Sequence, residues 1–228
     1  FLFASPFTDD STKWFKTFKS WGFDSVEIAV EHESHIDPAY VKSELDRNGL
    51  VAGTLCGAFG PGRDLRGTPE EQQACLDYVH KLIDMMGILD APVLVGPIYS
   101  AVGRAEFVPE KERRAQWKQV VKHLKTLCKY AEKKKKMIAL EPLNRFETDF
   151  INTCDQAIQM IQDVGSPALS IHLDTFHMNI EEKDPAKAIR KAGTMLGHFH
   201  ACGSDRGTPG LRGVSLEVCC GEIVGIAA

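Results

Sequence analysis

Short apolar runs rich in β-branched residues recur along the chain, and longer amphipathic segments separate them. The runs span residues 25–30, 51–57, 92–97, 137–143, 169–175 and 196–202. Near-continuous apolar runs of this length are typical of strands in a parallel sheet that is covered on both faces. The apolar residues 1–4 are predicted to belong to a first strand that is cut short where the sequence begins.

The amphipathic segments between these runs have the periodicity of helices. They cover residues 11–21, 38–48, 69–86, 109–135, 154–163 and 185–192. Several begin with proline, which is favoured in the first helical turn. Strands and helices therefore alternate throughout, and repeated right-handed βαβ units predict an α/β protein with either a closed barrel or a doubly wound sheet.

Polar residues at the ends of three successive strands favour the barrel. Alternation along each strand makes Glu141, Asp174 and His200 inward-facing residues at the ends of their runs. The carboxyl ends of strands converge on one mouth in a TIM barrel, whereas a doubly wound sheet would spread them along an edge. One such residue alone is more often a solvated loop residue or a helix cap, but three with the same parity predict a common site.

The chemistry of this set points to a divalent cation. Two carboxylates and one imidazole suit Mn²⁺ or Mg²⁺, with Zn²⁺ or Co²⁺ as alternatives, and cysteine is absent from the set. His172 and His198 lie one inward layer below and are interpreted as buried, hydrogen-bonded residues of the interior.

Length, charge and cysteine content narrow the classes of protein further. The 228 residues suit one domain, and a net charge of −4 gives no basic excess to bind a nucleic acid. Seven cysteines without a CxxC pair predict a reducing, cytoplasmic location. The sequence contains neither a signal-peptide pattern nor a run of about 18 apolar residues, so no association with a membrane is predicted.

Three longer segments carry a resemblance to a known family. They are LEPLNRFET at residues 140–148, HLDTFHMNIEE at 172–182 and HFHACGSDRGTPG at 198–210. Together they resemble the D-tagatose 3-epimerase and D-psicose (allulose) 3-epimerase family, within the xylose isomerase-like TIM barrels of the sugar phosphate isomerase/epimerase superfamily. The resemblance implies a metal-dependent isomerase that interconverts free ketohexoses through an enediolate.

The resemblance also implies roles for individual residues. Three residues match metal ligands of the family: Glu141, Asp174 and His200. The metal implied is Mn²⁺, with Mg²⁺ or Co²⁺ as alternatives. Glu141 also matches a catalytic residue that transfers a proton. Glu147, His177 and Arg206 match residues that hold the ketose carbonyl and neighbouring hydroxyls. The chemistry of these residues agrees with such roles. All three lie in loops that follow strands, where Arg206 and His177 can donate hydrogen bonds to a sugar and Glu147 can accept one. The alternative interpretation is that they form surface salt bridges and helix caps.

The family pattern covers residues 1–210 and stops there. We therefore expect a barrel domain at 1–210 and an atypical tail at 211–228, in which the eighth βα unit is missing or replaced. The resemblance implies a fourth metal ligand, a glutamate on that unit, and neither Glu217 nor Glu222 has the family's spacing from Arg206. An impaired catalyst is accordingly one prediction for this chain.

Ketose 3-epimerisation is the main functional prediction, and the expected partner is a small ketose, with a homo-oligomer left open. An aldose–ketose or hydroxypyruvate-type isomerase on the same fold is the alternative within catalysis. A non-catalytic sugar-binding or partner-binding chain is another. A metal-dependent endonuclease acting at abasic DNA is disfavoured, because such enzymes need more metal ligands and a basic groove.

Overall fold

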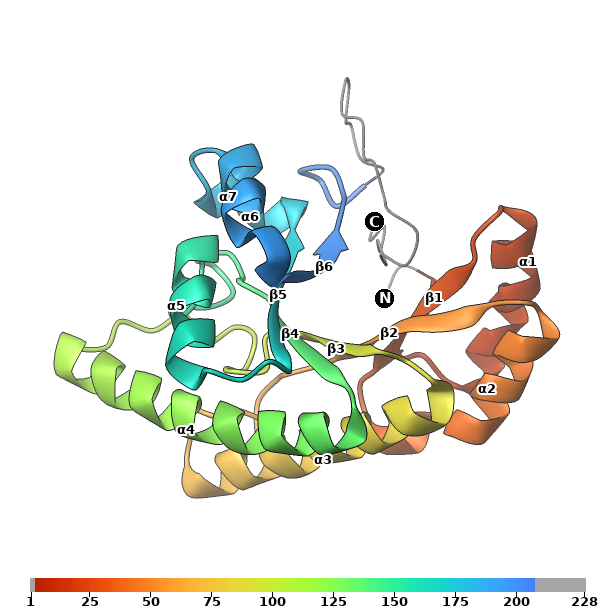
Figure 1. Ribbon diagram of the computed structural model, residues 1–228, viewed down its shortest axis with the longest axis horizontal. Coiled ribbons are helices and arrows are strands. Elements are labelled where there is room, and N and C mark those ends of the chain that lie inside the picture. Colours follow the sequence, from red (N-terminus) through yellow and green to blue (C-terminus); the bar gives the residue numbers. More distant parts are fainter. Residues whose placement is uncertain (1–2, 208–228) are drawn as a thin grey trace.

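A computed structural model describes residues 3–207 of the chain, and its centre is one parallel β-sheet (Figure 1). Six strands lie side by side in chain order, and every neighbouring pair is parallel. They are β1 (Ser25–Val30), β2 (Val51–Gly57), β3 (Val93–Gly96), β4 (Met137–Leu140), β5 (Leu169–Asp174) and β6 (Leu196–His200). The predicted α/β fold is confirmed: the sheet curls like the wall of a TIM barrel, and in the described residues β1 and β6 form its two edges.

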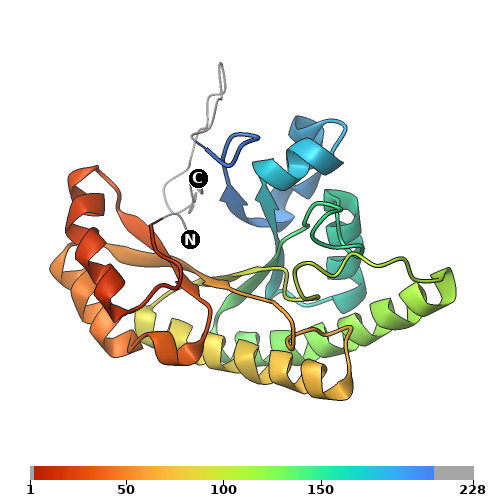
Figure 2. The ribbon, with the colours of Figure 1, turned by 180° about the vertical axis from the view of Figure 1, so that it is seen from behind.

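Helices cover the convex side of the curled sheet (Figure 2). The α-helices are α1 (Phe15–Ser20), α2 (Pro38–Arg47), α3 (Pro69–Leu89), α4 (Glu110–Lys134), α5 (Cys154–Val164), α6 (Thr175–Glu181) and α7 (Pro185–Ala192). The 3-10 helices are η1 (Asp9–Trp14), η2 (Glu33–His35) and η3 (Gly193–Met195). Helix α3 shows why the prolines mark helix starts: Pro69 follows Thr68, whose side chain caps the helix reciprocally with Glu71.

Two apolar cores of different size lie on the two faces of the sheet. The larger one fills the space between the strands and the helices, and its strand residues include the fully buried Ile28, Leu55 and Ile138. The smaller one lies on the concave face and consists of Ala29, Cys56, Val93, Val95 and Ala139, with Met137 packed against it. Because most of these residues are small, the concave face leaves room for polar side chains at the strand ends.

The strand positions predicted from the sequence are confirmed for all six described strands, with ends that differ by up to three residues. The predicted strand at residues 1–4 is wrong for Phe3 and Ala4, since Phe3 instead packs its ring 4.7 Å from that of Phe18 on α1. Residues 1–2 lie outside the described range. So do residues 208–228, and the predicted boundary at Gly210 therefore stays a prediction.

The helical predictions need two corrections. The segment predicted as one helix at 11–21 divides into η1 and α1. Residues that follow β5, predicted as a loop, form the short helix α6, because the side chain of Asp174 caps it by accepting a hydrogen bond from the Phe176 N–H. None of the helices among residues 3–207 is both long and apolar enough to cross a membrane.

Candidate metal and substrate site

The three predicted metal ligands meet at the carboxyl ends of their strands. Glu141 directly follows β4, while Asp174 and His200 end β5 and β6 and lie opposite each other in the parallel register. Each offers one ligand atom, and these atoms lie within 4.8 Å of one another. All three side chains are buried. The convergence predicted from strand parity is therefore present in the fold.

The facing atoms of this cluster have few internal partners. Asp174 uses Oδ1 to accept from the Phe176 N–H at 2.8 Å, and its Oδ2 lies 4.0 Å from Nδ1 of His200. Among residues 3–207 the Glu141 carboxylate accepts no hydrogen bond, and its nearest nitrogens are those of His172 and His177, each at 3.6 Å. Buried carboxylates are normally paired, so two that converge with an imidazole fit a divalent cation.

The crowding of these groups shifts their protonation. Burial raises the pKa of Glu141 to about 8, and nearby carboxylates add to this rise although His200 opposes it. Burial lowers the pKa of His200, but the charge of Glu27 and the hydrogen bond that His200 donates to it raise the value to about 9. A cation bound here would displace the protons that these two groups retain near neutral pH.

His172 and His198 are buried as predicted, but the expectation that they are hydrogen-bonded is wrong within the described residues. None of their four ring nitrogens makes a hydrogen bond of good geometry there, although Nε2 of His198 lies 3.3 Å from Oε2 of Glu27. The two rings instead pack edge-to-face with each other and with His200, at centroid distances of 5.0, 4.1 and 4.8 Å. Burial holds the pKa of His172 well below its usual value, so this ring is neutral.

These histidines form a second group that could hold a metal ion, since His172, His198 and His200 also bring ligand atoms within 4.8 Å of one another. The group shares His200 with the first cluster. Its carboxylate-free donor set would suit a softer ion than Mn²⁺. We favour the Glu141, Asp174 and His200 set because it has two anionic ligands with unpaired oxygens.

Glu27 on β1 is a member of the site that the sequence analysis missed. Its Oε2 accepts hydrogen bonds from Thr54 at 2.6 Å and from Nε2 of His200 at 3.1 Å, and it lies 3.3 Å from Nε2 of His198. Burial alone would raise the pKa of Glu27, but these histidines hold it well below its usual value. The sequence did contain a signal for this role, because Glu27 is a charged residue inside the apolar run at 25–30.

The three residues predicted to bind substrate lie next to the ligand cluster. His177 is buried on α6 with Nε2 3.6 Å from Glu141, while Arg206 and Glu147 form an ion pair at 2.9 Å. Asn144, which was also missed, joins them: its backbone N–H donates to Nδ1 of His177 at 3.1 Å, and its side chain donates to Glu147 at 2.8 Å. His177 lies on helix α6 rather than in a loop, and the ion pair of Arg206 with Glu147 is a contact that the alternative interpretation expected, so the substrate-binding roles stay predictions.

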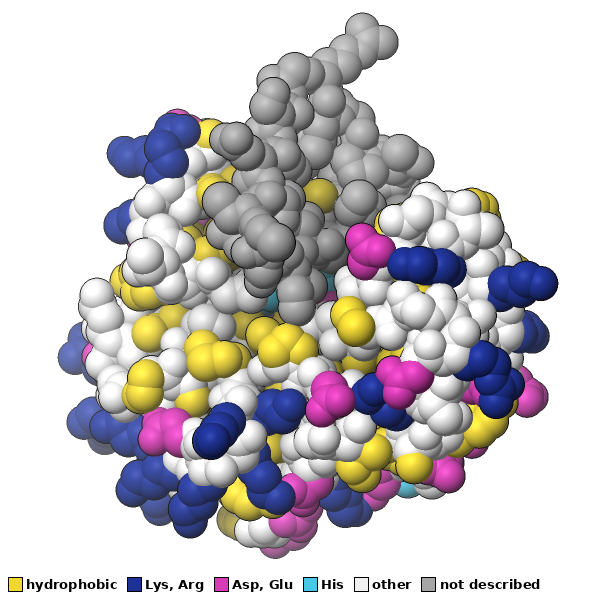
Figure 3. Space-filling view, turned by 45° about the vertical axis from the view of Figure 1, so that its right-hand side comes forward, with side chains coloured by type: hydrophobic (Ala, Val, Ile, Leu, Met, Phe, Trp, Pro, Cys, Tyr) yellow, Lys and Arg dark blue, Asp and Glu magenta, His cyan; other side chains and the backbone are white. Residues whose placement is uncertain are grey.

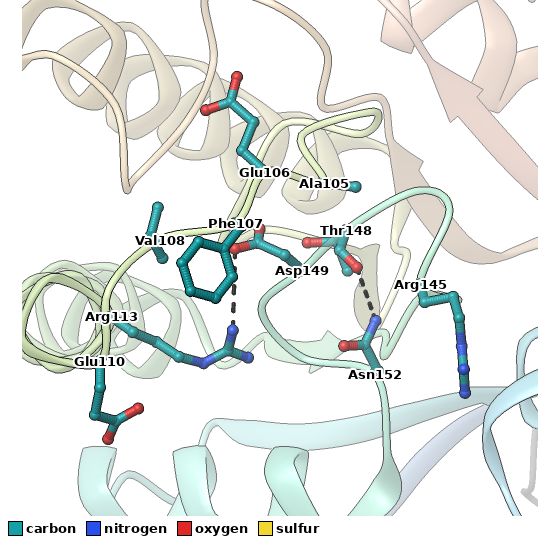
Figure 4. A pocket seen from close by; sticks show the side chains of 10 residues that line it. All are labelled: Ala105, Glu106, Phe107, Val108, Glu110, Arg113, Arg145, Thr148, Asp149 and Asn152. Carbon is teal, nitrogen blue, oxygen red and sulfur yellow. Dashed lines mark hydrogen bonds and ion pairs between the residues drawn. The ribbon is translucent and has the colours of Figure 1, made fainter.

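A surface pocket of about 550 Å³ lies elsewhere, between the loops that follow β3 and β4 (Figure 4). Phe107, Arg113, Arg145 and Asp149 are among its lining residues, and none of the three metal-ligand candidates lines it. Arg113 lies 3.9 Å from Asp149, so these charges compensate each other. The metal-ligand candidates converge at the buried cluster and not in this pocket.

Comparison with known proteins gives an independent view of the chain. A family model described as the xylose isomerase-like TIM barrel matches residues 15–225. A probable ketose 3-epimerase of Synechocystis sp. is 36% identical over 216 residues, covering 92% of this chain and 72% of its own length. A D-psicose 3-epimerase of Enterocloster bolteae is 32% identical over 216 residues, covering 87% of this chain and 69% of its own length.

The structural comparison agrees. The crystal structure of a D-allulose 3-epimerase from Methylomonas sp., in complex with D-allulose, matches with a TM-score of 0.85 and 30% identity, covering 92% of this chain and 72% of the other. A D-psicose 3-epimerase from Clostridium cellulolyticum, with D-tagatose, matches with a TM-score of 0.78 and 28% identity, covering 89% of this chain and 71% of the other. With the family model matching most of its length, this chain belongs to the xylose isomerase-like TIM barrel family.

Proposed function

We propose that the chain is a divalent-metal-dependent ketose 3-epimerase. Glu141, Asp174 and His200 hold the ion, which we take to be Mn²⁺. The observation that carries this proposal is the convergence of these three buried side chains at the mouth of the curled sheet. The ketose 3-epimerases among its relatives supply the reaction class.

Glu141 is the residue that we propose to move the proton. Epimerisation at carbon 3 requires a base that removes a proton from one face of the sugar and an acid that returns one on the other face. Burial raises the pKa of Glu141 to about 8 in the metal-free protein, and a bound cation would lower it, so that the carboxylate could act as the base. A bound divalent ion would supply charge stabilisation for the enediolate oxygens.

His177 is oriented to donate a hydrogen bond to the sugar. Its Nδ1 is the acceptor for the Asn144 N–H at 3.1 Å, so the ring proton of the neutral imidazole resides on Nε2. That Nε2 faces Glu141 at 3.6 Å. A ketose oxygen placed beside Glu141 would therefore meet a fixed donor, and burial keeps the pKa of His177 below its usual value so that the ring stays neutral.

Glu147 and Arg206 complete the rim of the proposed sugar site. Their side chains pair at 2.9 Å, and the guanidinium of Arg206 also lies 4.0 Å from the centre of the Phe176 ring. These contacts fix both groups in one direction while leaving further donors on Arg206 and acceptor capacity on Glu147. Both can then bind sugar hydroxyls, which fits a free ketose.

Incubation of the Mn²⁺-loaded protein with D-fructose, D-psicose and D-tagatose in deuterated water tests the proposal. We expect interconversion of carbon-3 epimers, with deuterium incorporated at carbon 3. Transfer of label between carbons 1 and 2 would instead identify an aldose–ketose isomerase. Saturable Mn²⁺ binding without exchange at any carbon would overturn the proposed activity and leave a metal-binding chain.

A further inference from the structure

The proposed metal site depends on the ring orientation of one histidine. An imidazole presents its two nitrogens in different directions, so His200 can aim only one of them at the cluster. Nδ1 lies on the side of Asp174, 4.0 Å from Oδ2, while Nε2 points away from it toward Glu27 on β1. The hydrogen-bond partner of Nε2 therefore sets the orientation of the His200 ring and determines whether Nδ1 is available as a metal ligand.

We propose that Glu27 is a positioning residue for the metal site, which holds the Nε2–H of His200 and so directs the Nδ1 lone pair toward Asp174 and Glu141. This inference rests on the metal site of the proposed function. A histidine that binds a metal commonly donates its remote N–H to a carboxylate, which sets the tautomer and makes the other nitrogen a better ligand. The contact of 3.1 Å between Nε2 and Oε2 of Glu27 has this geometry.

Glu27 is itself anchored, as a positioning residue must be. The Thr54 hydroxyl on the neighbouring strand β2 donates to the same carboxylate oxygen at 2.6 Å. Glu27 and Thr54 are register partners, and the register of β1 against β2 shifts directly before Glu27. The extra residue, Gly53, lies on β2, so the irregularity turns Thr54 toward the concave face, which Glu27 reaches by alternation with Ala29.

Glu27 also discriminates between the two possible metal groups of the interior. The alternative group of His172, His198 and His200 lies one layer deeper in the sheet, and its ring nitrogens could compete for an ion. Oε2 of Glu27 lies 3.3 Å from Nε2 of His198 and 3.1 Å from Nε2 of His200. The carboxylate thus engages two of the three rings on the side away from Asp174 and favours the carboxylate-containing set.

Calorimetric titration of Mn²⁺ into the whole chain tests this role. Loss of an outer hydrogen-bond partner typically weakens metal binding about 10- to 100-fold. Because the Glu27 side chain keeps 25% of its surface exposed, water can replace part of the contact, so we expect Glu27→Gln to weaken Mn²⁺ binding about tenfold. Glu27→Asp keeps the charge but shortens the reach, and we expect the same loss.

A matched control is Ser170→Ala, which also alters a buried polar residue of the sheet. The Ser170 hydroxyl donates to the Ile138 carbonyl at 3.1 Å, rather than to a proposed ligand, so Mn²⁺ affinity should stay at the level of the unchanged protein. The second readout is the tautomer of His200 in the Zn²⁺-loaded protein, obtained from two-bond proton–nitrogen couplings. We expect Zn²⁺ on Nδ1 with Nε2–H in the unchanged protein, and a mixture of rings bound through Nδ1 and through Nε2 in Glu27→Gln.

The outcomes separate the two proposals. If the unchanged protein does not bind Mn²⁺, the metal site of the proposed function is wrong. If it binds and Glu27→Gln and Glu27→Asp bind equally well, the role of Glu27 is wrong while the metal site stands. Should both variants fail to fold, Thr54→Val loosens Glu27 without removing it. A several-fold weaker Mn²⁺ affinity then supports the role, and an unchanged affinity overturns it.

Discussion

Two groups of buried charged side chains lie on the carboxyl-end side of the sheet, and their pairing differs. The first surrounds Arg66, whose side chain is fully buried in the loop after β2. Its guanidinium donates to both oxygens of Asp149 at 2.7 and 3.1 Å, to Gln116 at 3.0 Å and to Ser100 at 3.2 Å, and it lies 4.5 Å from the centre of the Phe150 ring. Every charge of this first group has a partner.

The second group is the cluster of Glu141, Asp174 and His200, whose facing atoms converge with little pairing. The Arg66 group joins the loops after β2, β3 and β4 into one body and gains from a complete hydrogen-bond network. The ligand cluster instead buries two carboxyl groups with few hydrogen-bond partners, at a cost to stability that a bound cation would offset. The paired charges around Arg66 thus stabilise the fold, whereas the cluster of Glu141, Asp174 and His200 keeps ligand atoms available for binding.

Charged residues on the surface differ from both buried groups. On the face drawn in Figure 3, Lys and Arg side chains are interspersed with Asp and Glu over the helical layer. Exposed pairs such as Arg114 with Glu110 on α4, at 2.8 Å, are typical of this layer. Such pairs contribute little to stability, so they provide controls for both buried groups.

The largest effect should come from removing the ionisable carboxyl group of Glu141. In Glu141→Gln we expect epimerisation to fall about 100- to 10,000-fold, because the side chain can no longer transfer a proton. The metal-free melting temperature at pH 7 should change little, since the amide resembles the protonated carboxyl that a pKa of about 8 favours there. A progress curve for D-fructose and a thermal melt measure the two quantities. Retained activity would contradict the proton-transfer role.

The next effect should come from breaking the paired group. Replacing Arg66 by methionine removes the main partner of the half-buried Asp149, which keeps Arg113 at 3.9 Å. Removal of one partner of a buried ion pair costs about 3–5 kcal/mol, and the remaining contact places the expected loss at about 3 kcal/mol. We expect that loss in the free energy of urea unfolding, with Mn²⁺ affinity of the folded protein nearly unchanged. Arg114→Met is the exposed control and should unfold like the unchanged protein. A selective loss of metal binding would show that the two groups are not separate.

A smaller effect should appear when pH changes the charge of the ligand cluster. The unfolded chain releases the proton of Glu141 near 4.5 and that of His200 near 6.5, whereas the folded chain keeps them to about 8 and about 9. The folded state therefore binds more protons above pH 7, and its stability falls as the pH rises to about 8.5. His172 and His177, whose pKa values are lowered, are neutral in the folded state and mostly neutral in the unfolded state in this range.

Thermal melts of the metal-free protein between pH 7 and 8.5 check this expectation. Each group should contribute on the order of 1 kcal/mol per pH unit. Glu141→Gln is the matched control, because it removes one of the two groups and should flatten the curve. Mn²⁺ affinity should rise over the same interval as the competing protons become easier to displace. Stability that increases with pH would rule out this assignment.

The smallest effect on metal binding is expected for His177→Ala. His177 lies beside Glu141 but does not belong to the converging ligand atoms. Its loss should leave Mn²⁺ affinity within about threefold of the unchanged value, while the lost hydrogen bond to substrate, about 0.5–1.5 kcal/mol, raises KM or lowers kcat several-fold. Calorimetry and steady-state kinetics separate the two. A loss of Mn²⁺ binding as complete as in Asp174→Ala would make His177 a ligand.

Local patterns in the sequence predicted much of this arrangement. Alternation located the six described strands and the inward parity of Glu141, Asp174 and His200, since these depend on the spacing of residues within one strand. The role of Glu27 escaped because its partner His200 lies on the far edge strand, 173 residues later. Asn144 escaped for a similar reason, as its contact with His177 forms only when α6 packs beside the loop after β4.

The first residues and η1 show a different limit. Phe3 has the apolar character of a strand residue, but aromatic packing against Phe18 determines its place. The segment at 11–21 has helical periodicity, yet its first part tightens into η1, where Thr8 and Ser11 bond reciprocally. Tertiary packing and local capping override periodicity at such positions.

The bond between Glu27 and His200 also bears on how the chain reaches this fold. Neighbouring strands pair in chain order, so most sheet contacts close only one βα unit, whereas this bond closes a loop of 173 residues. Closing a longer loop costs more chain entropy, and contacts of high sequence separation therefore tend to form late. Interactions that form after the folding transition state act mainly on the unfolding rate. The bond should accordingly slow the opening of the curled sheet, and a cation bound at His200 would add to that kinetic barrier.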